Sequence, residues 1–298
     1  MKILNFGSLN IDYVYQVDHM VRAGETLSSA DMEPFLGGKG FNQSVALAKA
    51  GVSVYHAGMI GEDGEIFRDV CRQYGIHTDY IKTGKGKNGH AIIQIDQTAQ
   101  NCILLYGGSN QQITREYADE VLSHFDKGDY ILLQNEISEL GYIIDKAYEI
   151  GMKIILNPSP FDVHIEKCEL RKVFCFLLNE VEGNQMTGET EPELIAEKIL
   201  LRYPEAKVVL TLGKNGSAYF DKENSFTQEI YAVKAVDTTA AGDTFTGYFI
   251  MGLLTGLSIG DNLKMCAVAS GITVSRKGAS TSIPTKQEVE DQLQNSQW

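Results

Sequence analysis

The sequence lacks an apolar run long enough to cross a membrane. Its longest run, residues 245–257, includes threonine and glycine and is shorter than the ~20 apolar residues that a membrane-spanning helix needs. The opening residues Met-Lys-Ile-Leu-Asn-Phe are too short for the apolar region of a secretory signal, and they predict a strand. We therefore expect no membrane partner and no secretory segment.

Paired cysteines are also missing. Five cysteines are scattered along the chain without a Cys-x-x-Cys pair, at positions 71, 102, 168, 175 and 266. An odd number without such a framework argues against a disulfide scaffold and is typical of a protein in the reducing cytoplasm. The six histidines show no spacing typical of metal ligands, so we expect them at the surface or in packing.

Positive charge is scarce. The chain has 26 lysines and arginines against 39 aspartates and glutamates, a formal net charge of −13, and no basic block. Such a chain repels a polyanion, which argues against a nucleic-acid partner. The sequence shows no repeat, linker or low-complexity segment. Its 298 residues, 43% of them hydrophobic, predict one large α/β domain over residues 1–298.

Two common nucleotide-binding motifs are absent as well. The segment Gly37-Gly-Lys-Gly-Phe-Asn-Gln-Ser lacks the glycine spacing and the final Lys-Ser/Thr of a Walker loop, and it lacks the Gly-x-Gly-x-x-Gly fingerprint. It is instead a glycine turn that leads into a helix ending near Gly51. Lys39 and Asn42 therefore project from a turn whose backbone can approach a ligand closely.

A second glycine turn carries an acidic residue. Ala240, Ala241 and Gly242 directly precede Asp243, and an apolar helical run follows. Small residues and a helix N-terminus present unpaired N–H groups to an anion, which a carboxylate would repel. The conflict disappears if the anion is a transferring phosphoryl group and Asp243 accepts a proton from the attacking hydroxyl. The alternative is an ordinary helix start with an acidic first turn.

Asn10 and Asp12 form a third polar element, after the apolar residues near the N-terminus. Residues two apart in an extended chain point the same way, so this amide and this carboxylate can grip neighbouring sugar hydroxyls together. The alternative is a turn, in which asparagine and aspartate are common.

Short apolar strands alternate with helical segments along the chain. The candidate strands are 3–8, 53–59, 129–133, 152–156, 173–178 and 206–211, and the candidate helices are 40–50, 64–74, 114–124, 138–150, 191–202, 242–256 and 261–276. This alternation predicts a mostly parallel sheet covered on both faces, with ligands beyond the carboxyl ends of the strands. Further extended segments without helices between them predict an extra β element, at 12–17, 26–36, 90–96 and 101–106.

Together these segments resemble the phosphofructokinase-B family of sugar kinases, also called the ribokinase family, and are most similar to its ribokinase branch. Two motifs of the family are present, Gly37-Gly-Lys-Gly-x-Asn42 and Asp237-Thr-x-Ala-Ala-Gly-Asp243, and the resemblance runs from Gly7 to about Pro284. It implies a three-layer α/β sandwich around a Rossmann-like, mostly parallel sheet. It also implies a small β lid, residues 12–36 and 88–107, through which two subunits pair as a homodimer.

The resemblance implies roles for the two glycine turns. Asp243 matches the catalytic base, and the backbone N–H groups of Ala240, Ala241 and Gly242 match an anion hole. The positions that match sugar contacts are Asn10, Asp12, Gly38, Lys39, Asn42 and Glu136, together with Asp243. A cation at a helix N-terminus is electrostatically unfavourable, which favours a functional Lys39 over a solvated one.

ATP and Mg²⁺ are the cofactors that the resemblance implies. The matching nucleotide positions are Asn179, Glu182, Thr211, Gly213 and Gly216. In the family the Asn-x-x-Glu pair organises Mg²⁺ and the phosphates largely through water, which suits a well-hydrated cation. The alternative for Asn179 and Glu182 is a structural capping box.

A potassium ion beside the anion hole is implied as an activator, bound mainly by carbonyl groups. The matching positions are Asp237, Thr239, Val274, Lys277 and Ala279. Two positions depart from common family patterns. Ala240 stands where many relatives have glycine, although close relatives share the alanine, and Ala267 stands where some members have a histidine near the adenine.

The implied activity is phosphorylation of the 5-hydroxyl of D-ribose by Mg-ATP, with the sugar and ATP as small-molecule partners. Nucleosides, deoxyribose and fructose are alternative substrates within the family. Tyr13, Phe41 and Tyr106 are candidates for a nucleoside base pocket or for lid packing. A sugar-binding protein that has lost catalysis is a further alternative, but Asp243 and its glycine turn are both retained.

Overall fold

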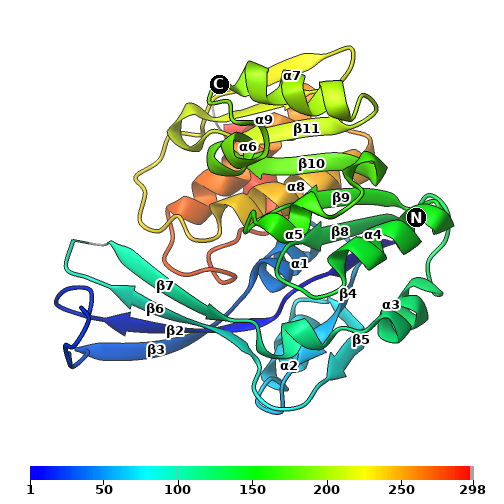
Figure 1. Cartoon of the computed structure of the whole chain (residues 1–298). Helices are drawn as coiled ribbons and strands as arrows, with labels where there is room; N and C mark the ends of the chain where they lie inside the picture. Colours follow the sequence, from blue (N-terminus) through cyan, green and yellow to red (C-terminus); the bar gives the residue numbers. More distant parts are fainter. Residues whose placement is uncertain (99, 296–298) are drawn as a thin grey trace.

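The structure is a computed structural model that describes residues 1–98 and 100–295. Position 99 of the predicted lid and residues 296–298 of the predicted domain lie outside the described residues. Within the described ranges no helix combines the length and the apolar character needed to cross a membrane. The chain forms a large sheet surrounded by helices and a smaller sheet beside it (Figure 1).

The main sheet has nine strands in the order β13-β12-β11-β10-β9-β8-β1-β4-β5. All neighbours from β11 to β5 are parallel, whereas β12 and β13 run antiparallel at one edge. The strands are β1 (Ile3–Phe6), β4 (Val54–Ile60), β5 (His77–Thr83), β8 (Tyr130–Gln134), β9 (Lys153–Asn157), β10 (Val173–Asn179), β11 (Lys207–Thr211), β12 (Ser217–Phe220) and β13 (Ser225–Gln228). The parallel strands therefore bring their carboxyl ends together along one edge, where such sheets bind ligands.

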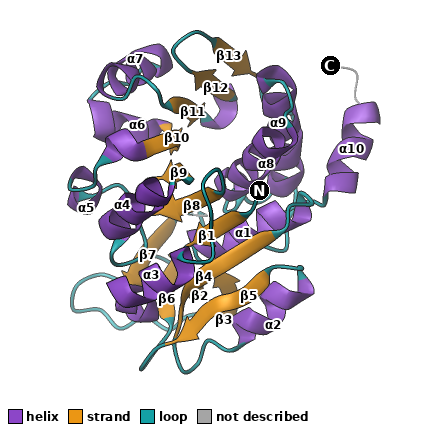
Figure 2. Ribbon diagram, turned by 90° about the vertical axis from the view of Figure 1, so that its right-hand side faces the viewer, coloured by secondary structure: helices purple, strands orange, loops and turns teal. Residues whose placement is uncertain are grey.

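Helices cover both faces of the main sheet (Figure 2). One face packs against α3 (Arg115–Leu122), α4 (Leu140–Ile150), α5 (Val163–Glu166), α6 (Glu180–Thr187) and α7 (Pro192–Arg202). The other packs against α1 (Lys39–Lys49), α2 (Ile66–Gln73), α8 (Ala241–Thr255), α9 (Ile259–Val274) and α10 (Lys286–Asn295). Alternation along β1 explains the two cores, because Leu4 and Phe6 face the first and Ile3 faces the second.

The smaller sheet forms the lid, with strands in the order β3-β2-β6-β7. Its strands are β2 (Asn10–Gln16), β3 (Asp31–Gly37), β6 (Gly89–Ile95) and β7 (Asn101–Tyr106). It extends away from the main sheet on the side where β1 ends (Figure 1). Only residues 7–9 separate β1 from β2, so the lid begins at the carboxyl edge of the main sheet.

The predicted fold class is confirmed, and all six predicted main strands are present. The predicted lid strand at 26–36 begins only at Asp31, and the hairpin at 90–96 and 101–106 corresponds to β6 and β7. The elements predicted from the sequence did not include β5, β12, β13, α5, α6 or α10. β5 and β13 form the two edges of the main sheet, and like α10 they carry many exposed residues and lack a long apolar pattern. β12 is buried but has only four residues, and α5 and α6 are also short. Short 3₁₀ helices complete the chain, η1 (Gly108–Gln112), η2 (Leu170–Lys172) and η3 (Gly213–Asn215).

Candidate active site

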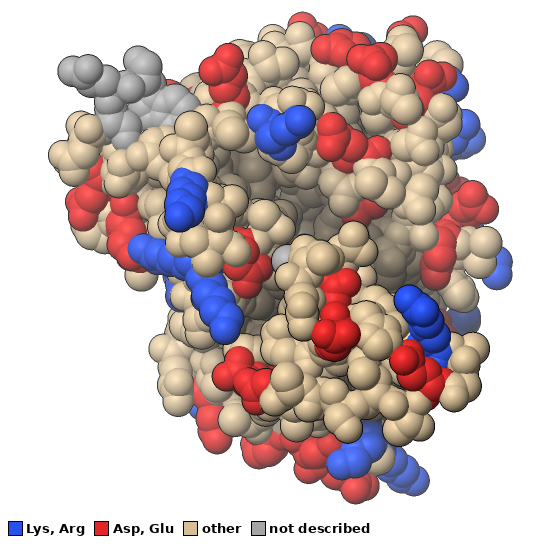
Figure 3. All heavy atoms as spheres, turned by 90° about the vertical axis from the view of Figure 1, so that its left-hand side faces the viewer, with Lys and Arg blue, Asp and Glu red and all other residues tan. Residues whose placement is uncertain are grey.

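Two neighbouring cavities lie where the central strands end and where α1 and α8 begin. The small cavity has a volume of about 70 Å³ and the large cavity about 370 Å³. Thr211, Gly242 and Phe245 line both, so the start of α8 is a wall that they share. The face of the molecule toward the lid is hollowed near its centre, with acidic and basic side chains around the hollow (Figure 3).

Asp243 is held in the wall of the small cavity by two amide groups. It is 8% exposed. Its Oδ2 accepts a hydrogen bond from Asn42 Nδ2 at 3.1 Å, and its Oδ1 accepts one from Gln43 Nε2 at 2.9 Å. Asn42 was predicted from the sequence as a site residue, whereas Gln43, its neighbour in the same glycine-rich segment, was not. Both carboxylate oxygens are therefore oriented by α1.

The start of α8 leaves backbone N–H groups unpaired beside this carboxylate. The N–H of Ala241 donates to the Thr238 carbonyl at 3.2 Å, whereas those of Gly242 and Asp243 have no partner among the described residues. Ala240, just before the helix, is fully buried. The free N–H groups and the positive end of the helix dipole make this turn suitable for an anion.

Asp12 and Glu136 add two further carboxyl groups near Asp243 and Lys39. Burial raises the pKa of Asp12 to about 7, and the negative charges of Glu136 and Asp243 contribute to the increase. Burial also raises the pKa of Asp243, against the opposing effects of Lys39 and of the two amide donors. Perturbed carboxyl groups around a single cation are typical of functional sites.

The same carboxyl groups change the pKa of Lys39. Burial on its own would lower the pKa of this lysine, but the charge of Asp243, followed by those of Glu136 and Glu182, outweighs burial and raises it. Lys39 therefore stays charged in the cavity wall, next to the groups that the sequence analysis assigned to both substrates.

Gly38 allows the chain to bring Lys39 to this position. Its φ is 92°, which disfavours other residues, and a Cβ there would lie 2.9 Å from the backbone nitrogen of Asn10. Glu136 Oε2 accepts the backbone N–H of Lys39 at 3.0 Å and the hydroxyl of Ser8. Glu136 thus ties the segment after β8 to the first turn of α1.

Asn10 and Asp12 stand on the lid strand β2, separated by one residue, and therefore share a face. Asn10 Oδ1 accepts a hydrogen bond from Asn110 Nδ2 at 2.7 Å, and Asn110 Oδ1 accepts the Leu9 N–H at 3.1 Å. Asn110 thus holds Asn10 in place, and it was not predicted from the sequence because it lies in η1 and not after a strand. A Cβ at Gly37 would lie 2.0 Å from Asp12 Oδ2, so glycine makes room for that carboxylate.

The small cavity also reaches the residues assigned to the nucleotide. Asn179 and Glu182 line it together with Lys39 and Asp243. They form a capping box, in which the Glu182 N–H donates to Asn179 Oδ1 at 2.8 Å and the Asn179 N–H donates to Glu182 Oε2 at 2.9 Å. The structural alternative is therefore present, and it holds the Glu182 carboxylate in the cavity wall at the same time.

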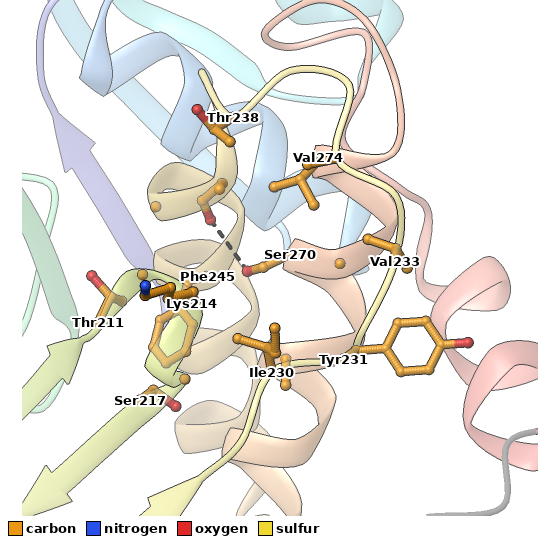
Figure 4. Close-up of a pocket in the computed structure, with 17 residues that line it drawn as sticks. Thr211, Lys214, Ser217, Ile230, Tyr231, Val233, Thr238, Phe245, Ser270 and Val274 are labelled. Carbon is orange, nitrogen blue, oxygen red and sulfur yellow. Dashed lines mark hydrogen bonds between the residues drawn. The ribbon is translucent and has the colours of Figure 1, made fainter.

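The large cavity has mostly apolar walls (Figure 4). Ile230 and Phe245 point toward its middle, while the ring of Tyr231 points away. The hydroxyl of Ser270 donates to the Ala241 carbonyl at 3.2 Å, which ties α9 to the start of α8. The loop that carries Ile230 and Tyr231 was not predicted from the sequence.

Three predicted nucleotide positions line this large cavity, Thr211, Gly213 and Gly216. Ala267 also lines it, at the position where some family members have a histidine. The small alanine leaves room there and offers no polar atom from its side chain. The wall at this point is therefore apolar.

The positions predicted for potassium lie on two segments that contact each other. The Oδ1 of Asp237 accepts the Thr239 N–H at 2.9 Å, and its Oδ2 accepts the Gly278 N–H at 3.0 Å. Burial would raise the pKa of Asp237, but the hydrogen bonds from Thr239 and Gly278 lower it. The Asp237 carboxylate is thus a negative charge held between the two segments, next to Lys277.

Two of the predicted carbonyl ligands are already engaged. The Val274 carbonyl accepts the N–H groups of Val236 and Asp237 at 2.7 and 3.2 Å. The Ala279 carbonyl accepts the N–H and the hydroxyl of Ser282 at 3.1 and 2.7 Å. Since a carbonyl oxygen has two lone pairs, neither group fits a cation in this conformation without losing a hydrogen bond. The described residues also contain no cluster of three His, Cys, Asp or Glu side chains able to hold a metal.

Comparison with known proteins identifies the family. The model of the pfkB family of carbohydrate kinases matches residues 1–286. Ribokinase from Haemophilus influenzae is 33% identical over 299 residues, covering 97% of each chain. The structure of Arabidopsis thaliana ribokinase complexed with ribose and ATP is similar, with a TM-score of 0.86, 29% identity and 99% coverage of each chain. Deoxyribokinase from Salmonella typhi is 27% identical, covering 98% of this chain and 99% of the relative.

The chain therefore belongs to the pfkB family of carbohydrate kinases. Within this class of phosphotransferases it is a ribokinase-like carbohydrate kinase, which confirms the family resemblance and the enzyme class predicted from the sequence.

Proposed function

We propose that this chain transfers the γ-phosphoryl group of ATP to the 5-hydroxyl of D-ribose. The observation that carries the proposal is the buried carboxylate of Asp243, oriented by Asn42 and Gln43 beside free N–H groups of α8. It lies in the small cavity, next to a larger apolar cavity suited to a nucleotide base. The Arabidopsis relative bound to ribose and ATP supports the choice of both substrates.

In the proposed reaction, the oxygen of the sugar 5-hydroxyl forms a bond to the γ-phosphorus of ATP, and Asp243 accepts the proton that this hydroxyl loses. The bond from that phosphorus to the leaving oxygen of ADP breaks. The N–H groups at Gly242 and Asp243 stabilise the charge that develops on the phosphoryl oxygens. We assign the backbone of Ala240 and Ala241 to the same anion hole, where the Ala241 N–H would have to exchange its hydrogen bond to the Thr238 carbonyl for one to a phosphoryl oxygen. Lys39 balances the negative charge of the carboxyl cluster.

We assign the remaining contacts on the sugar side to Asn10, Asp12, Gly38, Asn42 and Glu136. On the nucleotide side we assign Thr211, Gly213 and Gly216 to ATP, and Asn179 and Glu182 to the hydrated Mg²⁺ that accompanies it. The Glu182 carboxylate in the wall of the small cavity fits a cation bound through water. When bound, Mg²⁺ supplies charge neutralisation at the phosphates.

Potassium activation is a separate part of the proposal, at Asp237, Thr239, Val274, Lys277 and Ala279. The charge of the partly buried Asp237 carboxylate supports potassium binding, although each of the two engaged carbonyls would have to give up a hydrogen bond. Turnover measured in potassium and in tetramethylammonium at equal ionic strength tests it. Equal rates in the two salts would remove potassium from the proposal.

We also propose one α/β domain over residues 1–298 with a lid from residues 12–36 and 88–107, working in the cytoplasm as a homodimer. The lid edge supports dimerisation, because Ile103, Leu104 and Leu105 on β7 are 52%, 67% and 52% exposed. Leu104→Lys is expected to yield a monomer in sedimentation analysis. The control Leu201→Lys changes a residue of α7 that is 81% exposed and should leave the assembly unchanged.

The substrate is tested by ADP release from Mg-ATP over a panel of ribose, 2-deoxyribose, fructose, adenosine and inosine. We expect the highest kcat/KM for ribose. A higher value for deoxyribose or for a nucleoside would replace ribose and keep the phosphoryl-transfer site. No turnover with any sugar or nucleoside would favour a binding protein without catalysis.

A further inference from the structure

A chain of buried amides runs from the glycine turn of α1 to Asp243. Asn5 on β1, Gln134 at the end of β8 and Gln43 on α1 are at most 1% exposed. Asn5 Nδ2 donates to the Gly40 carbonyl at 2.7 Å, and Asn5 Oδ1 accepts Gln134 Nε2 at 3.0 Å. Gln134 Nε2 also donates to Gln43 Oε1 at 2.7 Å, and Gln43 Nε2 donates to Asp243 Oδ1 at 2.9 Å.

The acceptors at the two ends of this row of amides determine which way each amide group is turned. The Gly40 carbonyl can only accept a hydrogen bond, so the Nδ2 of Asn5 faces it and the Oδ1 of Asn5 faces Gln134. Gln134 must then use its Nε2 toward Asn5, and the same nitrogen reaches the Oε1 of Gln43. Gln43 is therefore left with its N–H groups toward Asp243. An ionised carboxylate, which can only accept, fits this end of the chain.

A second contact prevents the Gln43 amide from turning over. Its Nε2 also donates to Asn157 Oδ1 at 3.2 Å, and Asn157 Nδ2 donates to the Leu177 carbonyl at 2.8 Å. Turning the Gln43 amide would place its oxygen against the Asp243 carboxylate and against Asn157 Oδ1, and its nitrogen against Gln134 Nε2. Three hydrogen bonds would become three repulsive contacts in a buried site.

We propose that Gln43 is a positioning residue that keeps Asp243 ionised and aimed at the substrate hydroxyl, and that Gln134 and Asn5 hold Gln43 in the required orientation. The inference rests on the proposed function, in which Asp243 is the base. Neither Gln134 nor Asn5 lines either cavity, and the hydrogen bond from Gln134 to Gln43 connects them to Asp243.

The electrostatic surroundings explain why such support is needed. Burial raises the pKa of Asp243, and Glu136 raises it further. The charge of Lys39, then the hydrogen bonds from Gln43 and Asn42, act in the opposite direction. Asp12 on the lid strand and Glu182 across the small cavity are the other carboxyl groups that face this cluster. The hydrogen bond from Gln43 is therefore one of the few influences that lower the pKa of Asp243, and its loss should raise that pKa.

The test compares Gln43→Leu and Gln134→Leu with the control Gln73→Leu, at an exposed position of α2. The dependence of kcat on pH is measured with the preferred sugar and ATP at saturation. The hydrogen bond from Gln43 lowers the pKa of Asp243. In Gln43→Leu, the fall of kcat on the acidic side of its pH profile should therefore occur at a pH about one unit higher than in the wild type. Gln134→Leu should move it in the same direction by a smaller amount, and Gln73→Leu should not move it.

The outcomes separate this inference from the proposed function. An Asp243→Ala enzyme that keeps its kcat would remove the base, and both proposals would fall. If Asp243→Ala is inactive but a folded Gln43→Leu enzyme keeps the wild-type pH profile, the positioning role alone is overturned. Thermal melting establishes folding, and Gln134→Leu serves as the second variant if Gln43→Leu does not fold. A fall in kcat that is equal at every pH in either variant would mark a purely structural role and also overturn the inference.

Discussion

The small cavity and the large cavity share the start of α8 but are built from different chemistry. The small cavity is surrounded by buried carboxyl and amide groups whose orientation is fixed by hydrogen bonds, such as Asp243 and Glu182. The large cavity is walled mainly by apolar side chains and glycine backbone, and Ile230 and Phe245 point toward its middle. Oriented polar groups discriminate strongly between ligands, because a buried polar group left unpaired is costly, whereas apolar walls discriminate weakly. We therefore expect changes in the first region to affect catalysis and sugar selection, and changes in the second to affect nucleotide affinity.

The largest effect is expected for Asp243→Ala. It removes the proposed base and should lower kcat about a thousandfold, while the KM for ATP changes little. Steady-state kinetics measures both, with the exposed Asp79→Ala on β5 as a control that should behave as wild type. A kcat within tenfold of wild type would contradict the role of Asp243.

Asp12→Asn should produce the next largest effect and a change in pH dependence. The pKa of Asp12 is raised to about 7, so its ionised, hydrogen-bond-accepting form appears as the pH rises through that value. The KM for the sugar should therefore fall between pH 6 and pH 8 in the wild type. In Asp12→Asn the KM should be roughly thirtyfold higher at pH 8 and nearly independent of pH. An unchanged pH dependence in the variant would assign the titration to another group.

Gly242→Ala probes the wall that the two cavities share. A Cβ at this position meets no protein atom within 4 Å and would project into open space. The helix should gain up to about 1 kcal/mol of stability, because alanine favours a helix over glycine. The KM for ATP should nevertheless rise about tenfold, because the methyl group occupies space near the proposed phosphates. Melting and kinetics on the same sample measure both effects, and an unchanged KM would place the phosphates elsewhere.

The smallest effect is expected for Ile230→Ala in the large cavity. This residue is 43% exposed, so its truncation should leave the melting temperature almost unchanged. The loss of apolar contact with the base should raise the KM for ATP about fourfold and leave kcat and the KM for the sugar unchanged. Equal changes in the two KM values would show that the two cavities are not functionally separate.

The glycine turns could be found from the sequence because their chemistry is local. Gly38, Lys39 and Asn42 lie within one short segment, as do Gly242 and Asp243, so their spacing already indicates a turn and a helix start. The alternation of apolar segments likewise predicted the parallel sheet, because a strand buried on both faces is apolar throughout. The family resemblance then supplied roles that no spacing indicates.

Gln43 shows what the sequence could not provide. Its partners Gln134, Asn157 and Asp243 are far away along the chain and meet it only after the sheet and both helices have formed. An amide in a helix has many possible roles, and only its neighbours in space select one. The loop carrying Ile230 was missed for a related reason, since it has no regular structure and becomes a wall only beside α8 and α9.

The position of Asp12 on the lid has a mechanical consequence. Glu136 and Asp243 belong to the main body, so any movement of the lid sheet changes the separation between like charges. If the lid closed over an empty site, the carboxylates of Asp12, Glu136 and Asp243 would come closer together in a region poor in water. Their mutual repulsion would then favour the open position of the lid. A polyhydroxyl ligand placed between them would donate hydrogen bonds to each carboxylate and would offset this repulsion. We therefore expect closure of the lid to depend on a bound polyhydroxyl ligand, which would also protect ATP from attack by water.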